Sequence, residues 1–552
     1  MLLILGALML AATVSDSEQT PADLVLLHAK IWTGDPGKPE AQALAARGGR
    51  IVALGSDEEI AKRKGTGTAV VDAAGRRVVP GFIDAHTHMS MGGFNLLALD
   101  LRRTPDPGEF TRSVADFAKT RPAGAWLTDG AWDHEQWSPP RLPTKEMLDP
   151  ATGDHPTCLS RQDGHMIVCN SIALKLARIT RETPDPPGGV IVRGARGEPT
   201  GVLKDAAMDA ITAVRPPRTL EELSQALSTA MRHAASVGVT SVQDLPGDPR
   251  DLEAWEAIRR AGALTVRVHY RLPLAEWERA RDRRSSLRND EWLRLGGVKG
   301  YADGSLGSST ALFDAPYADD RNNRGVFASE AIPLSRMEER VAAADRAGLQ
   351  VVIHAIGDRA NGEILDLYER VARANGPRNR RFRIEHAQHL RPADIPRFAR
   401  LGVIASMEPY HAIDDGRWAE KRIGRERCRT TYAFRSLLDA GAALAFGSDW
   451  DVAPLSPIAG MDAAVTRRTI DGKNPRGWFP EQRISPKEAL VAYTSGAAWA
   501  AFEENEKGAL TPGRLADFVV LSRDVLKIPK EEIAAVHVDE TVVGGRVVYT
   551  RR

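Results

Sequence analysis

The middle of the chain alternates short apolar segments with amphipathic ones, and this alternation constrains the fold more than any other feature. The apolar segments have the length and composition of buried parallel strands, and the segments between them fit helices. Amphipathic helical patterns occupy 219–237 and 334–348, each ahead of a predicted strand. Eight predicted strands of this kind favour a (β/α)8 barrel. The eight predicted strands are 78–86, 237–244, 264–272, 294–302, 349–355, 381–387, 402–408 and 443–449.

Both ends of the chain are rich in β-type sequence with glycine-containing turns. Residues 22–79 and 506–552 contain short apolar runs, and the second range includes a Gly-Gly turn at 544 and 545 that predicts a hairpin. We therefore predict one small β-sandwich domain built from both chain ends, and a barrel over 80–505. The stretch from about 90 to 218 is too long for one crossover helix, so it predicts a long insert after the first barrel strand.

The N-terminus resembles a signal peptide. Residues 1–15 are an apolar run followed by small residues and an abrupt change to polar sequence, although no Lys or Arg follows Met1. The run is too short for a comfortable membrane span. It predicts a periplasmic or secreted protein with no stable membrane span after cleavage. The alternative is a cytoplasmic protein in which this run is a buried first element.

Composition narrows the class of partner. The chain has 74 Lys and Arg residues against 73 Asp and Glu residues, so no charge bias draws it to nucleic acid, and a small-molecule substrate fits better. Cys158, Cys169 and Cys428 are too few and too scattered for a disulfide framework or a Cys-rich zinc site. A metal must therefore rely on His and carboxylate ligands. The oligomeric state stays open, with a homodimer as one option.

Five residues have the types and positions of metal ligands. His86 and His88 in PGFIDAHTH alternate along a strand, so their side chains share a face. His354, His386 and Asp449 each stand at the end of another predicted strand, where barrel enzymes place catalytic groups. A lone His in such a place is usually structural and a lone Asp often caps a helix, but coincidence at several strand ends favours a metal site. Four imidazoles and one carboxylate suit Zn²⁺, or Mn²⁺ or Fe²⁺.

The insert holds a second dense group of polar residues. Arg161, Asp163 and His165 lie in RQDGHMIVCN, which the residues alone also allow to be a surface turn. Trp132 and its neighbour Trp137 are candidates for the wall of an apolar substrate pocket, although large aromatics are more often core. GSLGSST at 304–310 lacks the ending of a phosphate-binding loop, so we interpret it as a flexible loop at the barrel mouth.

Taken together, these motifs resemble a known superfamily. PGFIDAHTH, the strand-end residues and GALTPGRLADFVVLS resemble the amidohydrolase superfamily. The segments LSRQDGHMIVCNSIAL, GEPTGVLKDAA, VKGYADGSLGSSTALF, HAIGDRA and RIEHAQ resemble its YtcJ-like branch, which includes N-substituted formamide deformylases. The resemblance covers nearly all of the chain after the leader.

The resemblance implies one or two divalent metal ions, most suitably Zn²⁺, at the mouth of the barrel. It assigns His86, His88 and Asp449 to the first ion, and His354 and His386 to the second. Lys299 stands where many members carry a carboxylated lysine that bridges two metals, and a neutral amine can capture CO2 as an anionic carbamate. The alternative for Lys299 is an ion pair with Asp303.

The resemblance also implies hydrolysis of an amide-type C–N bond in a small molecule such as an N-formyl or N-acyl amine. A metal-bound hydroxide would attack the carbonyl, with Asp449 carrying the proton to the leaving nitrogen. His165 is the candidate for a carbonyl or oxyanion contact, and Arg161 and Asp163 are expected beside the substrate. Glu408 replaces the family's usual Gln, and could pair with a substrate amine or alter the metal site.

Two other functions remain open at this point. A mononuclear aminohydrolase or cyclic-amide hydrolase could use the same barrel with one metal. A non-catalytic binding relative should have lost ligands, yet all five are present. His411, close to Glu408, is a further candidate without an assigned role.

Overall fold

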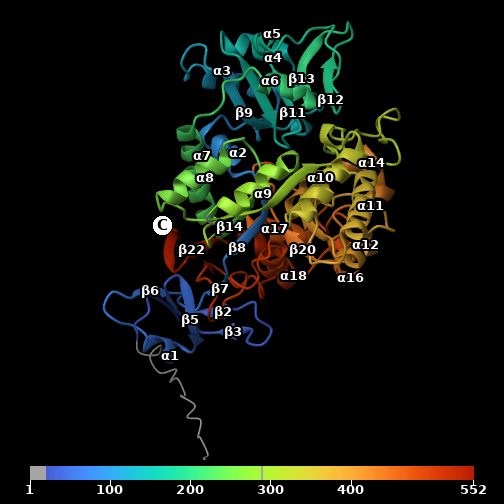
Figure 1. The fold of residues 1–552 in the computed structure, drawn as a ribbon. Helices are drawn as coiled ribbons and strands as arrows, with labels where there is room; N and C mark the ends of the chain where they lie inside the picture. Colours follow the sequence, from blue (N-terminus) through green and yellow to red (C-terminus); the bar gives the residue numbers. More distant parts are fainter. Residues whose placement is uncertain (1–19, 288–289) are drawn as a thin grey trace, which may run out of the picture.

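The computed structural model describes residues 20–287 and 290–552. The predicted signal peptide at 1–15 lies outside the described residues. In Figure 1 a barrel occupies the middle of the molecule, a domain built from residues after the first barrel strand lies above it, and a β-sandwich lies below it. Within the described part of the chain, no helix combines the length and the apolar character needed to cross a membrane.

The barrel is a sheet of eight parallel strands, which confirms the (β/α)8 prediction. Each predicted strand overlaps an observed one. Thr87 and Trp450 form a parallel bridge between the two ends of the sheet, so the barrel is nearly closed. In sheet order the strands are β8 (Phe82–Thr87), β14 (Val239–Asp244), β15 (Arg267–Pro273), β16 (Leu293–Tyr301), β17 (Gln350–Ala355), β18 (Arg383–His386), β19 (Ile404–Met407) and β20 (Leu444–Phe446).

One predicted strand is divided in the structure. The apolar run 78–86 contributes β7 (Arg77–Pro80) to the sandwich and β8 to the barrel. Gly81 stands between them, where a β-carbon would lie 2.2 Å from the Thr240 hydroxyl oxygen. The run looks continuous in sequence because both strands are buried. The backbone changes sheet at the one residue that leaves room for Thr240.

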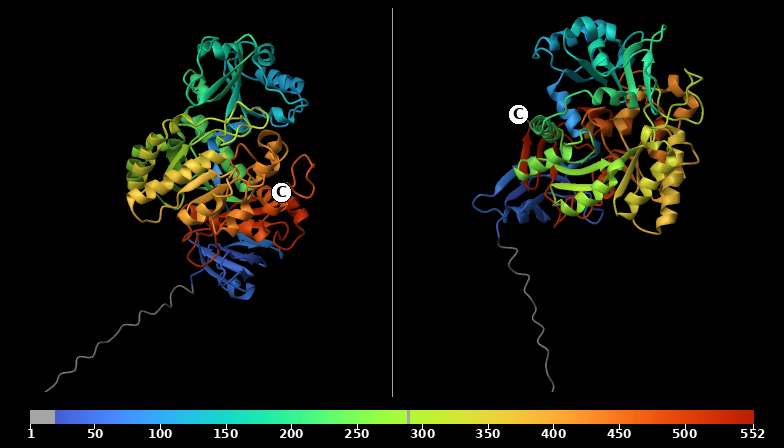
Figure 2. Two further views of the ribbon diagram at one scale, coloured as in Figure 1. Left: turned by 90° about the vertical axis from the view of Figure 1, so that its right-hand side faces the viewer. Right: turned by 45° about the horizontal axis from the view of Figure 1, so that its top comes forward.

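Helices surround the barrel (Figures 1 and 2). The predicted helix at 219–237 is α7 (Leu220–Ser236), which begins with a capping box formed by Thr219 and Glu222. The predicted helix at 334–348 is α10 (Leu334–Arg346). Their buried apolar residues join the largest core cluster of the described residues, together with side chains of the barrel strands.

The sandwich takes strands from both chain ends. Its six-stranded sheet joins β2 (Lys30–Trp32), β3 (Glu40–Ala41) and β7 to β21 (Phe518–Leu521), β22 (Val538–Val543) and β23 (Arg546–Thr550). Its four-stranded sheet holds β1 (Leu24–Leu27), β4 (Ala43–Arg47), β5 (Arg50–Gly55) and β6 (Ala69–Asp72). Arg267, at the start of β15, forms two hydrogen bonds of 2.6 and 2.9 Å to Asp517. The sandwich is therefore joined to the barrel at the end where the strands begin.

The insert contains a five-stranded sheet in the order β12-β13-β11-β10-β9. The strands are β9 (Leu127–Trp132), β10 (Thr157–Arg161), β11 (Met166–Cys169), β12 (Gly189–Arg193) and β13 (Pro199–Asp205), and the helices beside them include α3 (Pro107–Ala118), α4 (Lys145–Thr152) and α5 (Ser171–Leu176). Cys158 and Cys169 lie directly opposite each other on β10 and β11 and form a disulfide. This single disulfide, which the sequence analysis did not predict, is not a disulfide framework, and Cys428 is free.

Candidate metal centre

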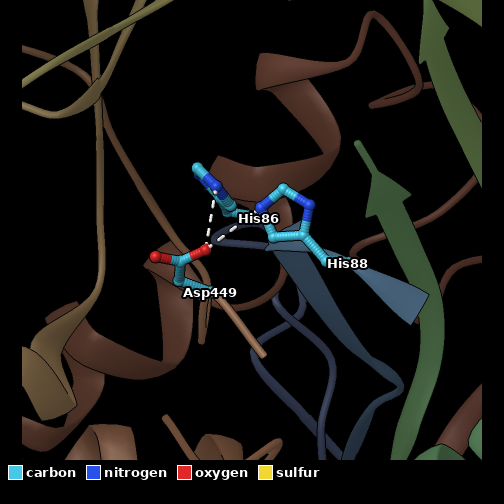
Figure 3. Close-up of side chains that lie close together, drawn as sticks. All are labelled: His86, His88 and Asp449. Atoms are coloured by element: carbon cyan, nitrogen blue, oxygen red, sulfur yellow. Dashed lines mark ion pairs between the residues drawn. The ribbon is translucent and has the colours of Figure 1, made fainter. Parts of the chain in front are cut away.

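Three of the predicted ligands meet closely at the end of the barrel where the strands finish. His86 is the fifth residue of β8, His88 follows that strand, and Asp449 lies three residues beyond β20. Figure 3 shows both imidazole rings directed toward the Asp449 carboxylate. Asp449 Oδ1 lies 3.2 Å from His86 Nε2 and 3.3 Å from His88 Nε2. One carboxylate oxygen and two ring nitrogens thus converge on a small space.

The other two predicted ligands, His354 and His386, lie next to this group. The ring of His386 lies 4.9 Å from that of His86 and 4.6 Å from that of His354, measured between centroids. Burial lowers the pKa of His354 and His386 well below the ordinary value, so both rings are neutral and can offer a lone pair to a cation. Three groups of described residues have ligand atoms close enough to hold an ion: His86, His88 and Asp449; His86, His386 and Glu408; His386, His411 and Asp449.

Carboxylates behind the rings hold the histidines in the form that a metal needs. His86 Nδ1 lies 2.6 Å from Glu385 Oε2, and His386 Nδ1 lies 2.7 Å from Glu408 Oε2. A ring that donates its Nδ1–H to a carboxylate keeps its Nε2 lone pair for a metal. The burial of Glu385 opposes ionisation, but Arg383 and His86 outweigh it and hold its pKa well below the usual range. The donor set therefore fits a divalent cation.

Glu385 is a site residue that sequence reasoning missed. Strict alternation would put Glu385 and His386 on opposite faces of β18, so only one of them should reach the centre. His386 has a φ of 70°, a left-handed conformation that breaks the alternation. Arg383 and Glu385, two residues apart, pair inside the barrel at 2.8 Å while His386 turns to the mouth. The Arg-x-Glu-His spacing is the signal that could have revealed this support.

Replacing Glu385 with glutamine is expected to weaken metal binding by about tenfold to a hundredfold, the usual effect of losing a carboxylate behind a ligating histidine. Glutamine keeps the shape but removes the charge that orients His86. Competition with a chromogenic chelator measures the metal affinity. Glu338→Gln is the matched control, because Glu338 pairs with Arg370 on the outer surface. An unchanged affinity in Glu385→Gln would show that the pair is not needed to orient His86.

Lys299 lies on the cavity floor without a partner. Its side chain is 1% exposed, its Nζ has no hydrogen-bond partner, and it lies 4.8 Å from the centre of the Tyr301 ring. Burial lowers the pKa of Lys299 to about 8. Asp303 does not pair with it, because that carboxylate accepts backbone N–H groups of Leu312, Ile356 and Gly357. The ion-pair alternative for Lys299 is not formed.

The centre lies at the base of a cavity of about 450 Å³ whose walls come from both the barrel and the insert. His165 contributes from the insert, its ring 5.3 Å from that of His354. Its Nδ1 lies 2.7 Å from Asp205 Oδ1. Burial opposes protonation of His165, but the hydrogen bond and charge of Asp205 outweigh it and raise the pKa to about 9. His165 is therefore an imidazolium at neutral pH, with its Nε2–H left as a donor.

Arg161 and Asp163 are placed together beside His165. Arg161 Nη1 lies 2.6 Å from Asp163, and its Nη2 lies 3.3 Å from Asp133. Asp163 lines the cavity and accepts a hydrogen bond of 2.6 Å from the Ser305 hydroxyl. Arg161 is engaged by these carboxylates and supports Asp163.

Ser305 belongs to the 304–310 segment, which we expected to be a flexible loop. The segment is mostly buried, and the contact between Ser305 and Asp163 joins it to the insert, so it is not a free loop.

Two predicted substrate contacts do not reach the cavity. Trp132 is fully buried in the core of the insert, where its Nε1–H donates to the Leu159 carbonyl at 2.8 Å. Trp137 lies in the same core. Glu408 is fully buried behind His386 and is not among the residues that line the cavity. The expectation of a substrate contact is therefore corrected for both Trp132 and Glu408: the insert needs its own apolar core, and the Glu408 carboxylate belongs to the histidine network.

Comparison with known proteins gives matches along nearly the whole chain. A family model described as "Amidohydrolase family" matches residues 69–549. Protein LONG AFTER FAR-RED 3 of Arabidopsis thaliana is 41% identical over 542 residues, covering 96% of this chain and 92% of that protein. Putative amidohydrolase YtcJ of Bacillus subtilis is 32% identical and covers 92% and 96%. N-substituted formamide deformylase of Arthrobacter pascens is 28% identical and covers 96% and 98%.

A solved structure shares the fold at similar coverage. It is described as an uncharacterized metal-dependent hydrolase from Pyrococcus furiosus, with a TM-score of 0.71 and 28% sequence identity. The match covers 91% of this chain and 100% of that chain. The similarity therefore includes the barrel and the domains attached to it.

Proposed function

This chain belongs to the amidohydrolase family of metal-dependent hydrolases, and from that premise we propose that it cleaves an amide-type C–N bond in a small N-formyl or N-acyl amine. The observation that carries the proposal is the convergence of His86 and His88 on Asp449 at the base of a cavity that His165 also lines. The name of one relative, N-substituted formamide deformylase, supports an amide as the substrate class.

The proposal assigns two divalent cations, most suitably Zn²⁺, to the centre. His86, His88 and Asp449 would hold one, and His354 and His386, with a carboxylated Lys299, would hold the other. Imidazole and carboxylate ligands suit Zn²⁺. When bound, such cations polarise the substrate carbonyl and lower the pKa of a water molecule.

Asp449 is proposed to move the proton. Burial opposes ionisation of Asp449, but His86 and His88 outweigh it and keep its pKa well below the ordinary value. An ionised carboxylate can accept a proton from the attacking water and pass it to the leaving nitrogen. Cleavage of the C–N bond needs that proton, because an amide nitrogen leaves as a neutral amine.

His165 is proposed to stabilise the carbonyl oxygen as it gains negative charge. Replacing it with alanine is expected to lower kcat by about a hundredfold to a thousandfold, as for other single oxyanion donors. Asp205→Asn should have a smaller effect in the same direction, because Asp205 keeps the ring charged. Steady-state kinetics with metal analysis tests this. A His165→Ala loss of kcat that only follows a loss of metal would contradict the assignment.

Lys299→Ala is expected to halve the metal content from two ions to one per chain, because the bridging carbamate is lost. Elemental analysis measures the stoichiometry, and carbon-13 NMR after growth with labelled bicarbonate detects the carbamate directly. Lys175→Ala, at an exposed lysine of α5 in the insert, is the control. One metal in the wild-type protein with no carbamate signal would favour a mononuclear centre instead.

The proposed function is tested by metal analysis of the purified protein with a panel of N-formyl, N-acyl and cyclic amides. We expect release of free amine from N-formyl or N-acyl substrates, loss of that activity with a chelator, and its return with Zn²⁺. Turnover restricted to cyclic amides, or deamination of aromatic amines without acyl transfer to water, would overturn the proposal.

We also propose export of the protein from the cytoplasm. The apolar leader motivates this, and the Cys158–Cys169 disulfide supports it, because disulfides persist in oxidising compartments. N-terminal sequencing of protein isolated from the periplasm or the medium tests the idea. A chain recovered uncleaved from the cytoplasm would contradict it.

A further inference from the structure

The cavity above the metal centre is rich in carboxylates and poor in cations. Among the described residues that line it there is no arginine, and the single lysine is Lys299. Arg161 lines a smaller neighbouring cavity at the same centre, but Asp133 and Asp163 already pair with it. Its other walls are largely apolar and include Met91, Met208, Pro246, Pro273 and Val326. The carboxylates that line it are those of Asp163, Asp205, Asp209, Asp303, Glu330 and Asp449.

Four of these carboxylates are already engaged. Asp163 pairs with Arg161, and Asp205 pairs with His165. Asp303 accepts three backbone N–H groups, and Asp449 belongs to the metal centre. Their charges are balanced within the protein or by the cation that the centre would hold. Asp209 and Glu330 remain.

Asp209 and Glu330 lie on the cavity wall, and neither forms a salt bridge with the described residues. Asp209 opens α6 (Asp209–Thr212), and its exposed side chain forms no hydrogen bond or ion pair with the described residues. Glu330 lies in η4 (Ser329–Ala331), is half-buried, and accepts a hydrogen bond from the Tyr301 backbone N–H. No salt bridge among the described residues includes either carboxylate: Arg340 and Lys299 act on Glu330 only from a greater distance, and burial alone acts on Asp209.

The two carboxylates border the same part of the cavity. A β-carbon on Gly188 would lie 2.6 Å from the Ser329 backbone nitrogen, and one on Gly189 would lie 2.3 Å from the Ala207 nitrogen. The Gly188–Gly189 turn is therefore packed between the segment that leads to Asp209 and the segment that holds Glu330. Both segments line the cavity, so the insert and the barrel each contribute one acidic group to one side of it.

We propose that Asp209 and Glu330 bind an ammonium group at the far end of the substrate. The preferred substrate is then an N-formyl or N-acyl amine whose amine part carries an apolar spacer and a terminal cation. The inference rests on the proposed function and adds a specificity to it. A substrate with a terminal carboxylate would meet two carboxylates and no arginine, so its charge would lose water without gaining a partner.

Three substrates of one length test the inference: N-formyl-diaminohexane, N-formyl-hexylamine and N-formyl-aminohexanoate, which carry a cationic, a neutral and an anionic tail. We expect the Zn²⁺-loaded enzyme to prefer the cationic over the neutral tail by about tenfold in kcat/KM, and the anionic tail to be the poorest. Two partly exposed carboxylates make this a moderate effect, and added salt should reduce it.

The Asp209→Asn/Glu330→Gln double variant is expected to lower the ratio of kcat/KM between the cationic and neutral tails to about one. Glutamine keeps an oxygen that accepts from the Tyr301 N–H, and the melting temperature checks the fold of the variant. Glu58→Gln, an exposed acid of the sandwich, is the control and should keep the wild-type ratio. Equal rates for the three tails in the wild-type enzyme, or a ratio that the double variant leaves unchanged, would overturn the inference.

The experiment distinguishes failure of the proposed function from failure of the ammonium-site inference. If the metal-loaded enzyme hydrolyses none of the three formamides, the proposed function fails for this substrate class. Calorimetric titration of the loaded protein with hexylamine and with hexanoate then decides the inference by binding alone. Binding of hexylamine that the double variant loses would support the ammonium site, and absence of binding, or equal binding of hexanoate, would overturn it.

Discussion

Replacing His86 with alanine is expected to abolish tight metal binding and hydrolysis together. His86 Nε2 faces Asp449, and its Nδ1 faces Glu385, so one side chain links the cavity to the carboxylate behind it. Its removal takes away one ligand and leaves the buried charge of Glu385 without one of its partners. We expect at least a thousandfold loss of kcat/KM, because in the proposed reaction the metal would supply both the activation of water and the polarisation of the carbonyl.

The His86→Ala result is read from elemental analysis and kinetics on the same sample. Because the variant leaves a buried charge, His86→Asn provides a second, more conservative test, with circular dichroism to confirm the fold. His537→Ala is the matched control, since His537 is an exposed residue of the sandwich region. Full metal content and full activity in either His86 variant would refute the assignment of this centre.

The barrel could be predicted because its parallel strands are buried along their whole length. Such strands appear in the sequence as short apolar runs. The amphipathic helices between them show a different periodicity of hydrophobic residues. The carboxyl ends of parallel strands share one end of a barrel, so His354 and His386 could be expected near each other without any knowledge of the loops. The structure places their rings 4.6 Å apart.

The residues that support the ligands could not be found in this way. Glu385 pairs with Arg383 and orients the ring of His86. His86 lies 299 positions earlier in the sequence, so no local pattern links the two residues. The pairing of Cys158 with Cys169 depends on the register of two strands in the insert. Trp132 shows the opposite error: its residue type suited a pocket wall, but a separate sheet domain needed it for its own core.

A physical reason prevents the sequence from separating residues that line a cavity from residues that lie behind it. A local pattern records whether a side chain is buried, but a buried carboxylate or indole has the same pattern whether it lines a cavity or lies behind it. Glu408 is fully buried and lies next to His386, as a site residue would, yet it does not line the cavity. Distances between elements are needed to separate the two cases.

Asp449→Asn is expected to lower kcat by about a thousandfold or more while a measurable part of the metal stays bound. The carboxamide has the shape of the carboxylate and keeps one oxygen near His86 and His88, but it cannot accept a proton at neutral pH. The loss of negative charge weakens the metal site as well. The two effects are separated by measuring kcat at saturating Zn²⁺, where occupancy no longer limits the rate.

The comparison that decides the role of Asp449 is between kcat and occupancy. Asp345→Asn is the matched control, because Asp345 is another buried aspartate, paired with Arg380 outside the cavity, whose loss should lower stability and leave kcat near the wild-type value. If Asp449→Asn recovers near wild-type kcat once the metal is restored, Asp449 is a ligand and the proton passes through another group. If kcat stays low at full occupancy, the carboxylate performs the proton transfer, because the metal, the cavity and His165 are all still in place.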